Sequence, residues 1–409
     1  MAELSDAEIV IVGGGAIGAA AADALARSGK CDILLIEKEP SLAAATTAQA
    51  AGLVGQVRSS MDRVKLAMWS VATFAELERR EETGPSWRQV GSLRIAATPE
   101  RAEEFRRLRQ VAAEAGLEVE LLDAPAASRL WPGMRFAEAK AILWCPSDGY
   151  LQPHDLTMAY QHRARRHGVR FATGVRLESI RVENGHVVGI GTSHDAIRCE
   201  MVINAAGAHA YHVARMVALE LPIVPVRHEY FISVPIAGIR PALPAFRVPD
   251  QTLYGRPDVN SLLLGGWEPE ALSLDPRSYA LEETPPPIAE DWSVLSNFAE
   301  LMRPFFPPVG EAGVRRVFSG WPTFTPDGRF IVGESRRVKG FVMAGGCNAH
   351  GVSGSAGIGR HLVEALTEKE PSPYVRSLSP DRFTERSWDW AQARRQAQAV
   401  YETYYTIGH

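Results

Sequence analysis

A glycine pattern near the N-terminus has the clearest chemical meaning in this chain. Residues 13–18 read Gly-Gly-Gly-Ala-Ile-Gly after an apolar run, and Glu37 ends the next apolar run. Gly13 permits a tight turn, Gly15 lets the backbone approach a pyrophosphate, and Gly18 allows close helix–strand packing. Glu37 is placed to bind a ribose, and an acid there argues against the 2′-phosphate of NADP. The pattern therefore predicts a site for FAD or NAD.

A second group of residues with phosphate- or ring-binding chemistry follows this unit. Residues 46–53 read Thr-Thr-Ala-Gln-Ala-Ala-Gly-Leu. The hydroxyl groups of Thr46 and Thr47 and the free backbone N–H groups can hold phosphate or the edge of a flavin. Taken alone, this segment is better explained as a solvated surface loop.

The elements that must position these residues form an α/β pattern. Segments 7–38, 170–207 and 325–367 have the apolar runs of parallel strands, and antiparallel-looking strands lie between them. A strand is expected over 87–97, and helices are expected over 62–81 and 99–115. We expect an α/β fold in which a discontinuous Rossmann-like domain is joined to an α+β domain with a mixed or antiparallel sheet. The expected ranges are 1–85, 148–215 and 321–380 for the cofactor domain, 86–147 and 216–320 for the substrate domain, and 381–409 for a C-terminal helical tail.

Composition and charge exclude several classes of function. The chain has 409 residues, 46% of them hydrophobic, and a net charge of −4. This balance gives no electrostatic basis for binding nucleic acid or anionic lipid. The four cysteines form no CxxC pair, so neither a metal site nor a disulfide framework is expected. The acidic residues before the first apolar run argue against a signal peptide, and we expect a cytoplasmic protein that is not an integral membrane protein.

Several further motifs give the chain a family resemblance. It resembles the D-amino-acid-oxidase-like FAD enzymes, above all the dimethylglycine and sarcosine dehydrogenase branch. Beside the two motifs above, the matching segments are 87–93, 148–150, 202–208, 228–230, 321–328 and 345–351. They run in the family order across nearly the whole chain.

The resemblance implies an FAD-dependent amine oxidoreductase and a set of cofactor-binding positions. Its last glycine-rich turn would direct a helix N-terminus at the flavin, where the dipole stabilises negative charge. The cofactor-binding candidates are Gly13, Gly15, Ala16, Ile17, Gly18, Glu37, Lys38, Thr46, Thr47, Gln49, Ala51, Gly52, Leu53, Leu177, Gly207, Gly346, Asn348, His350, Gly351, Val352 and Ser353.

The chain departs from the family at both common flavin attachment points. Relatives often attach FAD through a histidine in the threonine loop, where this chain has Gln49, or through a cysteine at a position matching Gly320. We therefore expect dissociable FAD. Larger relatives continue into a folate-binding aminomethyltransferase module, which this sequence does not include, so we expect no folate capture by this chain.

Catalytic candidates follow from the resemblance and from side-chain chemistry. His228 and Tyr254 match the cavity side of the family's substrate domain, where a histidine can accept a proton from an ammonium group. A structural hydrogen bond is the alternative for His228. Arg58, Arg256 and His350 are substrate-binding candidates, although for each arginine a solvated surface position is the alternative. Sarcosine oxidases carry a carboxylate-binding lysine where this chain has Ser353.

We therefore expect oxidation of a secondary or tertiary amine, such as sarcosine or dimethylglycine, by hydride transfer to flavin N5. The resulting imine would hydrolyse in water. One alternative is a D-amino acid, proline, hydroxyproline or 2-hydroxy acid on the same scaffold. The other is an FAD-bearing subunit of a hetero-oligomer, because the aromatic side chains of the tail leave room for a partner. The electron acceptor and the homo- or hetero-oligomeric state remain open.

Overall fold

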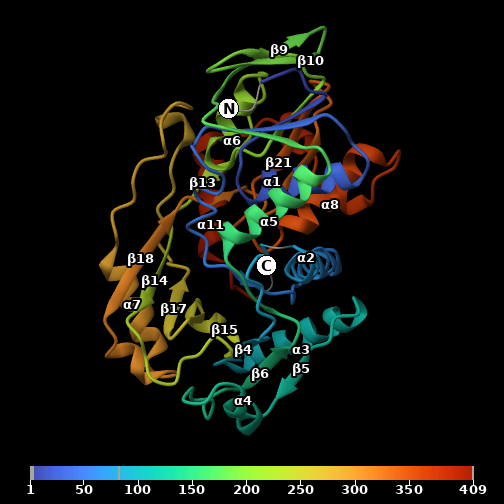
Figure 1. Cartoon of the computed structure of the whole chain (residues 1–409). Coiled ribbons are helices and arrows are strands. Elements are labelled where there is room, and N and C mark those ends of the chain that lie inside the picture. The colour runs from blue at the N-terminus through green and yellow to red at the C-terminus, as the bar shows by residue number, and fades with distance from the viewer. Residues whose placement is uncertain (1–3, 82, 408–409) are drawn as a thin grey trace.

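Two large β-sheets organise the computed structural model, which describes residues 4–81 and 83–407 (Figure 1). The first sheet has the order β20-β21-β12-β1-β2-β8, and its neighbours are parallel except for β20 and β21. Its strands are β1 (Ile9–Val12), β2 (Ile33–Glu37), β8 (Arg170–Thr173), β12 (Met201–Asn204), β20 (Ile331–Glu334) and β21 (Phe341–Gly345). Most of their side chains are buried, as expected for parallel strands covered on both faces.

Helices pack closely against this sheet because the sequence supplies small residues. Helix α1 (Ala16–Arg27) is rich in alanine and contacts both α5 (Pro153–Arg166) and α8 (Ser355–Thr367), while α2 (Met61–Arg80) contacts α8. Gly13 has a φ of +110°, which favours glycine, and a Cβ at Gly18 would collide with the Gly13 carbonyl. These glycines fix the sharp turn from β1 into α1.

The second sheet has the order β18-β14-β17-β16-β15-β4-β6-β5 and is antiparallel except between β15 and β4. Its strands are β4 (Ser92–Ala96), β5 (Glu120–Leu122), β6 (Ala141–Cys145), β14 (His228–Ser233), β15 (Ala245–Val248), β16 (Leu253–Asp258), β17 (Ser261–Gly266) and β18 (Val314–Gly320). Helices α3 (Pro99–Glu114), α4 (Ala124–Leu130) and α7 (Trp292–Met302) accompany it. The expected α/β class with a second mixed sheet is confirmed.

Smaller elements complete the fold. Strands β9 (Leu177–Glu183), β10 (His186–Thr192) and β11 (Ala196–Ile197) form a three-stranded sheet, and β3 (Leu53–Val54) pairs with β7 (Gly149–Tyr150). Strand β13 (Val224–Pro225) pairs with β19 (Thr323–Phe324). The remaining short helices are α6 (Ala210–Arg215), α9 (Pro373–Ser377), α10 (Asp381–Thr384) and the 3-10 turns Gly207–His209, Pro249–Gln251, Pro276–Ser278 and Pro307–Gly310.

One expected element boundary is wrong for a local reason. The strand expected over 87–97 is confined to Ser92–Ala96, because Gly91 has a φ of +74° and leaves the extended conformation. The last helix begins at Ser355, and residues 350–354 form the turn before it.

The C-terminal helix α11 (Trp390–Glu402) packs against the chain itself, with contacts to β13 and β19. Trp390 and Tyr401 are buried, and Trp390 Nε1 donates to Glu220 Oε1 at 2.7 Å. These two aromatic side chains are therefore not available to a partner, contrary to expectation. The amphipathic pattern of α11 predicts a buried face, and strands β13 and β19 cover that face.

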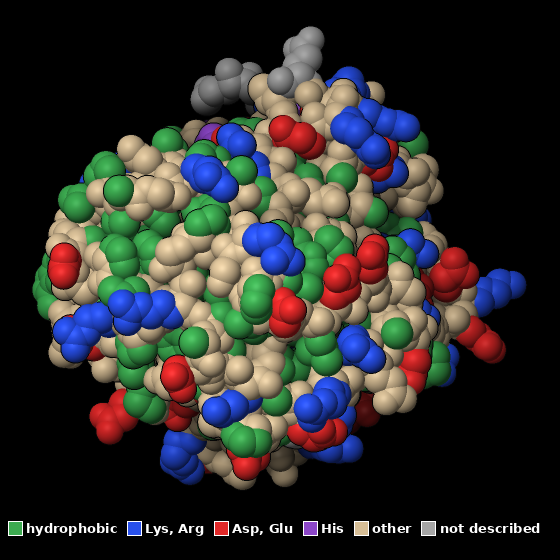
Figure 2. All heavy atoms as spheres, turned by 90° about the horizontal axis from the view of Figure 1, so that it is seen from below, with side chains coloured by type: hydrophobic (Ala, Val, Ile, Leu, Met, Phe, Trp, Pro, Cys, Tyr) green, Lys and Arg blue, Asp and Glu red, His purple; other side chains and the backbone are tan. Residues whose placement is uncertain are grey.

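The surface carries charges of both signs. On the face drawn in Figure 2, acidic and basic side chains are interspersed, in keeping with the small net charge. In residues 4–81 and 83–407, no helix combines the length and apolar character needed to cross a membrane.

Candidate active site

Two adjoining cavities run along the carboxyl ends of β1, β2 and β12. One, of about 760 Å³, lies beside the β1–α1 turn, and the other, of about 220 Å³, reaches the second sheet. They share lining residues, including Gly15, Thr46, Thr47, Gln49 and Gly207. The shared lining makes one extended groove from the first sheet to the second.

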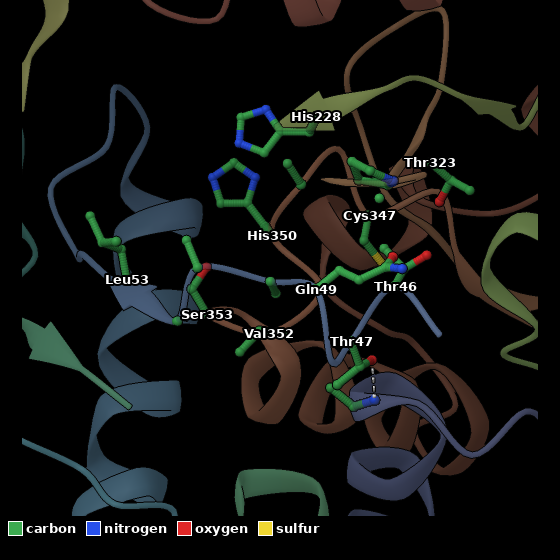
Figure 3. A pocket seen from close by; sticks show the side chains of 18 of the residues that line it. Thr46, Thr47, Gln49, Leu53, His228, Thr323, Cys347, His350, Val352 and Ser353 are labelled. Atoms are coloured by element: carbon green, nitrogen blue, oxygen red, sulfur yellow. Dashed lines mark hydrogen bonds between the residues drawn. The ribbon is translucent and has the colours of Figure 1, made fainter. Parts of the chain in front are cut away.

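The β1–α1 end of this groove has the features of a phosphate and ribose site. The N-cap residue of α1, Gly15, has no side chain to cap the helix, so apart from Ala16 N the first N–H groups and the partial positive charge of α1 face the groove. Thr47 Oγ1 accepts from Ala16 N at 3.1 Å and holds the threonine loop against this turn (Figure 3). Glu37 accepts from Gly14 N at 2.6 Å and from Glu39 N at 2.8 Å. Burial raises the pKa of Glu37, and these backbone donors oppose that shift. The N–H groups at the start of α1 and the Glu37 carboxylate therefore fit the phosphates and the ribose of a dinucleotide.

Most of the predicted cofactor-binding residues line the groove. The lining includes Gly13, Gly15, Ala16, Ile17, Glu37, Lys38, Thr46, Thr47, Gln49, Ala51, Gly52, Leu53, Leu177, Gly207, His350, Gly351, Val352 and Ser353.

Three of the cofactor candidates, Gly18, Gly346 and Asn348, support the groove from outside its lining. Asn348 Oδ1 accepts from Thr325 N at 3.0 Å, and Asn348 Nδ2 donates to the Gly346 carbonyl at 2.8 Å. These bonds close the turn between β21 and α8.

The two catalytic candidates are in direct contact at the second-sheet end of the groove. His228 Nε2 and Tyr254 Oη are 2.6 Å apart, and both residues line the cavity. Burial lowers the pKa of His228 to about 4 and raises the pKa of Tyr254 well above its ordinary value. Both groups are therefore neutral at neutral pH.

A chain of buried hydrogen bonds fixes the tautomer of His228. Tyr401 Oη donates to Glu268 Oε2 at 3.0 Å, and Glu268 Oε1 accepts twice from Arg227. Because the Tyr401 proton is used toward Glu268, His228 Nδ1 donates to Tyr401 Oη at 3.1 Å. His228 Nε2 is then the acceptor that faces Tyr254.

His350 lies in the same cavity as His228, and Figure 3 draws both rings in it. Its Nδ1 donates to the Asn348 carbonyl at 2.8 Å, so its Nε2 accepts from Tyr404 Oη at 2.9 Å. Burial, reinforced by the nearby Arg58 and Arg63, holds the pKa of His350 well below its usual range. His350 is therefore neutral, and it positions Tyr404 by accepting the hydrogen bond from the Tyr404 hydroxyl.

The two predicted substrate-binding arginines differ in position. Arg58 lines the cavity, and burial, reinforced by neighbouring arginines, lowers its pKa to about 10. Arg256 is 3% exposed and lies outside the cavity lining. Its Nε donates to the Ala51 carbonyl at 2.7 Å, and its Nη1 pairs with Asp258 at 3.2 Å. The structure thus gives Arg256 a supporting contact to the threonine loop, and not the expected place in the substrate cavity.

Sequence reasoning missed several residues of the cavity. Trp267, Tyr404 and Tyr405 line it, and Trp267 stacks on Tyr404 with ring centroids 3.8 Å apart. Arg247 lines the cavity as well. The aromatic run at the end of α11 was a signal that this segment is buried, but nothing in the sequence indicates which cavity it enters.

The two positions at which relatives are expected to attach FAD lie together. A Cβ at Gly320 would lie 2.7 Å from Gln49 Oε1, and both residues line the cavity. Because Gly320 has no side chain, the Gln49 side chain can occupy the space beside it.

Comparison with known proteins agrees with this site. The family model described as "FAD dependent oxidoreductase", abbreviated DAO, matches residues 8–365. The chain is 30% identical to 4-methylaminobutanoate oxidase (formaldehyde-forming) of Paenarthrobacter nicotinovorans, with 92% of this chain and 45% of the relative covered. It is 28% identical to mitochondrial dimethylglycine dehydrogenase of Rattus norvegicus, with 92% and 45% covered. The chain thus spans less than half the length of these two relatives.

The fold also matches a solved structure. L-proline dehydrogenase from P. horikoshii superposes with a TM-score of 0.84 at 22% identity, covering 94% of this chain and 99% of that chain. At this identity the likeness supports the fold alone. The family match over most of the chain, together with the dinucleotide groove, shows that the chain belongs to the DAO family of FAD-dependent oxidoreductases.

Proposed function

We propose that the chain oxidises a secondary or tertiary amine carrying an N-methyl or N-alkyl group, with FAD as the hydride acceptor. The observation that carries this proposal is the buried, neutral His228–Tyr254 pair, which lines the same cavity as the threonine loop and the last glycine-rich turn. A neutral pair suits an amine substrate, because the nitrogen must lose its ammonium proton before its lone pair can assist C–H cleavage.

When bound, FAD would supply the acceptor for a hydride from the carbon beside the substrate nitrogen. The protein's part is to orient that C–H bond, exclude water and receive the ammonium proton. Loss of the hydride leaves a carbon–nitrogen double bond. One water molecule then adds to that carbon, and hydrolysis releases an aldehyde and the shortened amine.

His228 and Tyr254 are the groups proposed to receive the ammonium proton. Tyr254 Oη donates to His228 Nε2, so its oxygen is free to accept a proton from the substrate as its own proton passes to the imidazole. The imidazolium so formed is balanced by Glu268 through Tyr401, because Glu268 holds the far end of the hydrogen-bond chain. Tyr401 and Glu268 are therefore positioning residues.

The relatives' names support the amine class. One is a 4-methylaminobutanoate oxidase described as formaldehyde-forming, and another is a dimethylglycine dehydrogenase. Both names describe amines with an N-methyl group. For this chain we propose the same bond type and leave the electron acceptor open.

A substrate panel tests the proposal. The FAD-loaded chain is mixed anaerobically with N-methylamino acids, D-amino acids, proline, hydroxyproline and 2-hydroxy acids, and the flavin absorbance is followed. We expect bleaching by the N-methyl compounds first. Bleaching only by one of the other classes would show that the substrate belongs to that class. Activity that appears only when a second subunit is added, checked by size exclusion, would assign the subunit alternative.

A further inference from the structure

A continuous chain of hydrogen bonds leads from the substrate cavity to a buried carboxylate. Tyr254 Oη lies 2.6 Å from His228 Nε2, His228 Nδ1 lies 3.1 Å from Tyr401 Oη, and Tyr401 Oη donates to Glu268 Oε2 at 3.0 Å. Strands β16 and β14 and helix α11 supply the first three side chains, and Glu268 follows β17. A proton that enters at Tyr254 can therefore leave at Glu268 through hydrogen bonds that already exist.

Buried aromatic rings enclose this chain of hydrogen bonds. Tyr254, Tyr401 and Glu268 are themselves buried. The Trp267 ring packs against the rings of His228 and Tyr401, with centroids 4.6 and 4.9 Å apart. In such low-dielectric surroundings, linked hydrogen bonds strengthen one another, and the polar groups exchange protons with their partners and not with bulk water.

Glu268, at the far end, lies in a cluster with more carboxylates than cations. Its Oε1 accepts from Arg227 Nε at 3.2 Å and from Arg227 Nη2 at 3.0 Å. Arg227 also pairs with Asp291 at 3.0 Å and with Glu229 at 3.6 Å. One guanidinium thus faces three carboxylates, so uptake of one proton relieves repulsion within the cluster. Burial raises the pKa of Glu268, and the hydrogen bonds from Arg227 oppose that shift.

The cavity end of the chain has the opposite balance of charge. Arg58 and Arg247 line the cavity, and its described lining contains no aspartate or glutamate. Like charge disfavours an ammonium group in this cavity and promotes loss of its proton. His228 is a poor final acceptor, because burial lowers its pKa to about 4, whereas burial raises the pKa of Glu268. The charges therefore favour movement of a proton from the cavity to Glu268.

We propose that Glu268 is the final acceptor of the proton that the amine substrate loses, and that Tyr254, His228 and Tyr401 relay this proton. The inference rests on the proposed amine oxidation and extends its proton path beyond His228. Glu268 does not touch the substrate, so it is a positioning residue that acts through the relay.

The relay moves one proton and leaves its three intermediate groups neutral. The substrate N–H bond breaks and an O–H bond forms at Tyr254, whose own proton passes to His228 Nε2. His228 Nδ1 gives its proton to Tyr401 Oη, and Tyr401 gives its proton to Glu268 Oε2. The imidazolium is then only transient, and every hydrogen bond in the chain has reversed. After the product leaves, the reverse movement returns the proton to water in the cavity.

Infrared difference spectroscopy tests the relay, because a protonated carboxyl group has a C=O stretch that a carboxylate lacks. FAD-loaded wild type, Glu268→Gln, Tyr401→Phe and the control Glu229→Gln are mixed anaerobically with the N-methyl amine that bleaches FAD fastest, in H₂O and in D₂O. Spectra are compared at matched extents of bleaching. Glu229 is the matched control because it is buried in the same cluster but lies outside the relay. Reduction by dithionite, which delivers no ammonium proton, supplies the flavin's own bands for subtraction.

We expect wild type and Glu229→Gln to gain the carboxyl band as FAD bleaches, with the shift in D₂O that an exchangeable proton gives. Glu268→Gln and Tyr401→Phe should lack this band. Glu268→Gln should also slow FAD reduction by about 10²-fold, the lower end of the range for general acid–base help, whereas Glu229→Gln should keep a rate near that of wild type. FAD content and the unfolding midpoint check that each variant is folded. Tyr401→Phe keeps every charge and tests the relay independently of how Glu268→Gln folds.

Bleaching of wild type without the carboxyl band would leave the proton at His228 and overturn the relay alone. A band that persists in Glu268→Gln or in Tyr401→Phe, or one that is lost in Glu229→Gln, would overturn it as well. No bleaching by any N-methyl amine would overturn the proposed oxidation, and the relay with it.

Discussion

At the scale of single residues, the contact between His228 and Tyr254 is central to the proposed chemistry. We predict that His228→Asn and Tyr254→Phe each slow anaerobic FAD reduction by about 10²- to 10⁴-fold, the usual range for general acid–base help. The flavin spectrum should stay nearly intact, because neither residue belongs to a cofactor motif. Stopped-flow absorbance measures both quantities. Wild-type rates in both variants would leave these residues with a structural role only.

The pH dependence follows from the burial of His228. Burial lowers the pKa of His228 to about 4 from its ordinary value of 6.5, so the imidazole is neutral throughout pH 5–8. We predict no inflection from His228 in the rate of FAD reduction between pH 5 and 8, because the imidazole can accept the substrate's proton throughout this range. Rate–pH profiles for two substrates of different amine pKa check this. An inflection near pH 6.5 that stays fixed between the substrates and disappears in His228→Gln would contradict the assignment.

At the scale of elements, helix α11 brings Tyr401 to the site. We predict that Tyr401→Phe slows FAD reduction by roughly 5- to 150-fold, since a broken buried hydrogen bond leaves His228 Nδ1 and Glu268 without their shared partner. The rate–pH profile should also change, because the tautomer of His228 is no longer fixed. FAD affinity and the unfolding midpoint should match those of the exposed control Thr406→Ala. A variant with an unchanged pH profile, or with a rate loss explained by lost FAD, would refute this positioning role.

Elements defined by local signals could be predicted from the sequence, whereas contacts between distant segments could not. The β1–α1–β2 unit was predictable because its signals are local: the glycine turn, the buried strands and Glu37 lie within a few dozen residues. The link from Tyr401 to His228 was not, because it spans 173 positions and depends on where α11 packs. Arg247 was missed for the same reason, since its place in the cavity depends on the pairing of β15 with β4 and β16. Arg256 was misjudged because alternation along β16 does not reveal that Ala51 and Asp258 engage its guanidinium.

At the scale of the whole molecule, the manner of FAD binding is a separate prediction. We predict dissociable FAD, because Gln49 and Gly320 occupy the positions at which relatives carry attaching residues. Cys347 is the cysteine in the described cavity lining, and burial raises the pKa of its thiol to about 12, so it is not a reactive thiolate at neutral pH. Acid precipitation should therefore leave the yellow colour in the supernatant. Colour that stays in the washed pellet would establish a covalent link.

The central claim concerns which bond the whole site breaks, and one single-turnover measurement tests it most directly. The FAD-loaded chain is mixed anaerobically with 4-methylaminobutanoate carrying either an N-CH₃ or an N-CD₃ group, and flavin bleaching and formaldehyde are followed together. We predict slower bleaching with the deuterated methyl group and one formaldehyde released for each FAD reduced. Equal bleaching rates with no formaldehyde, or no bleaching by any N-methyl amine, would contradict it.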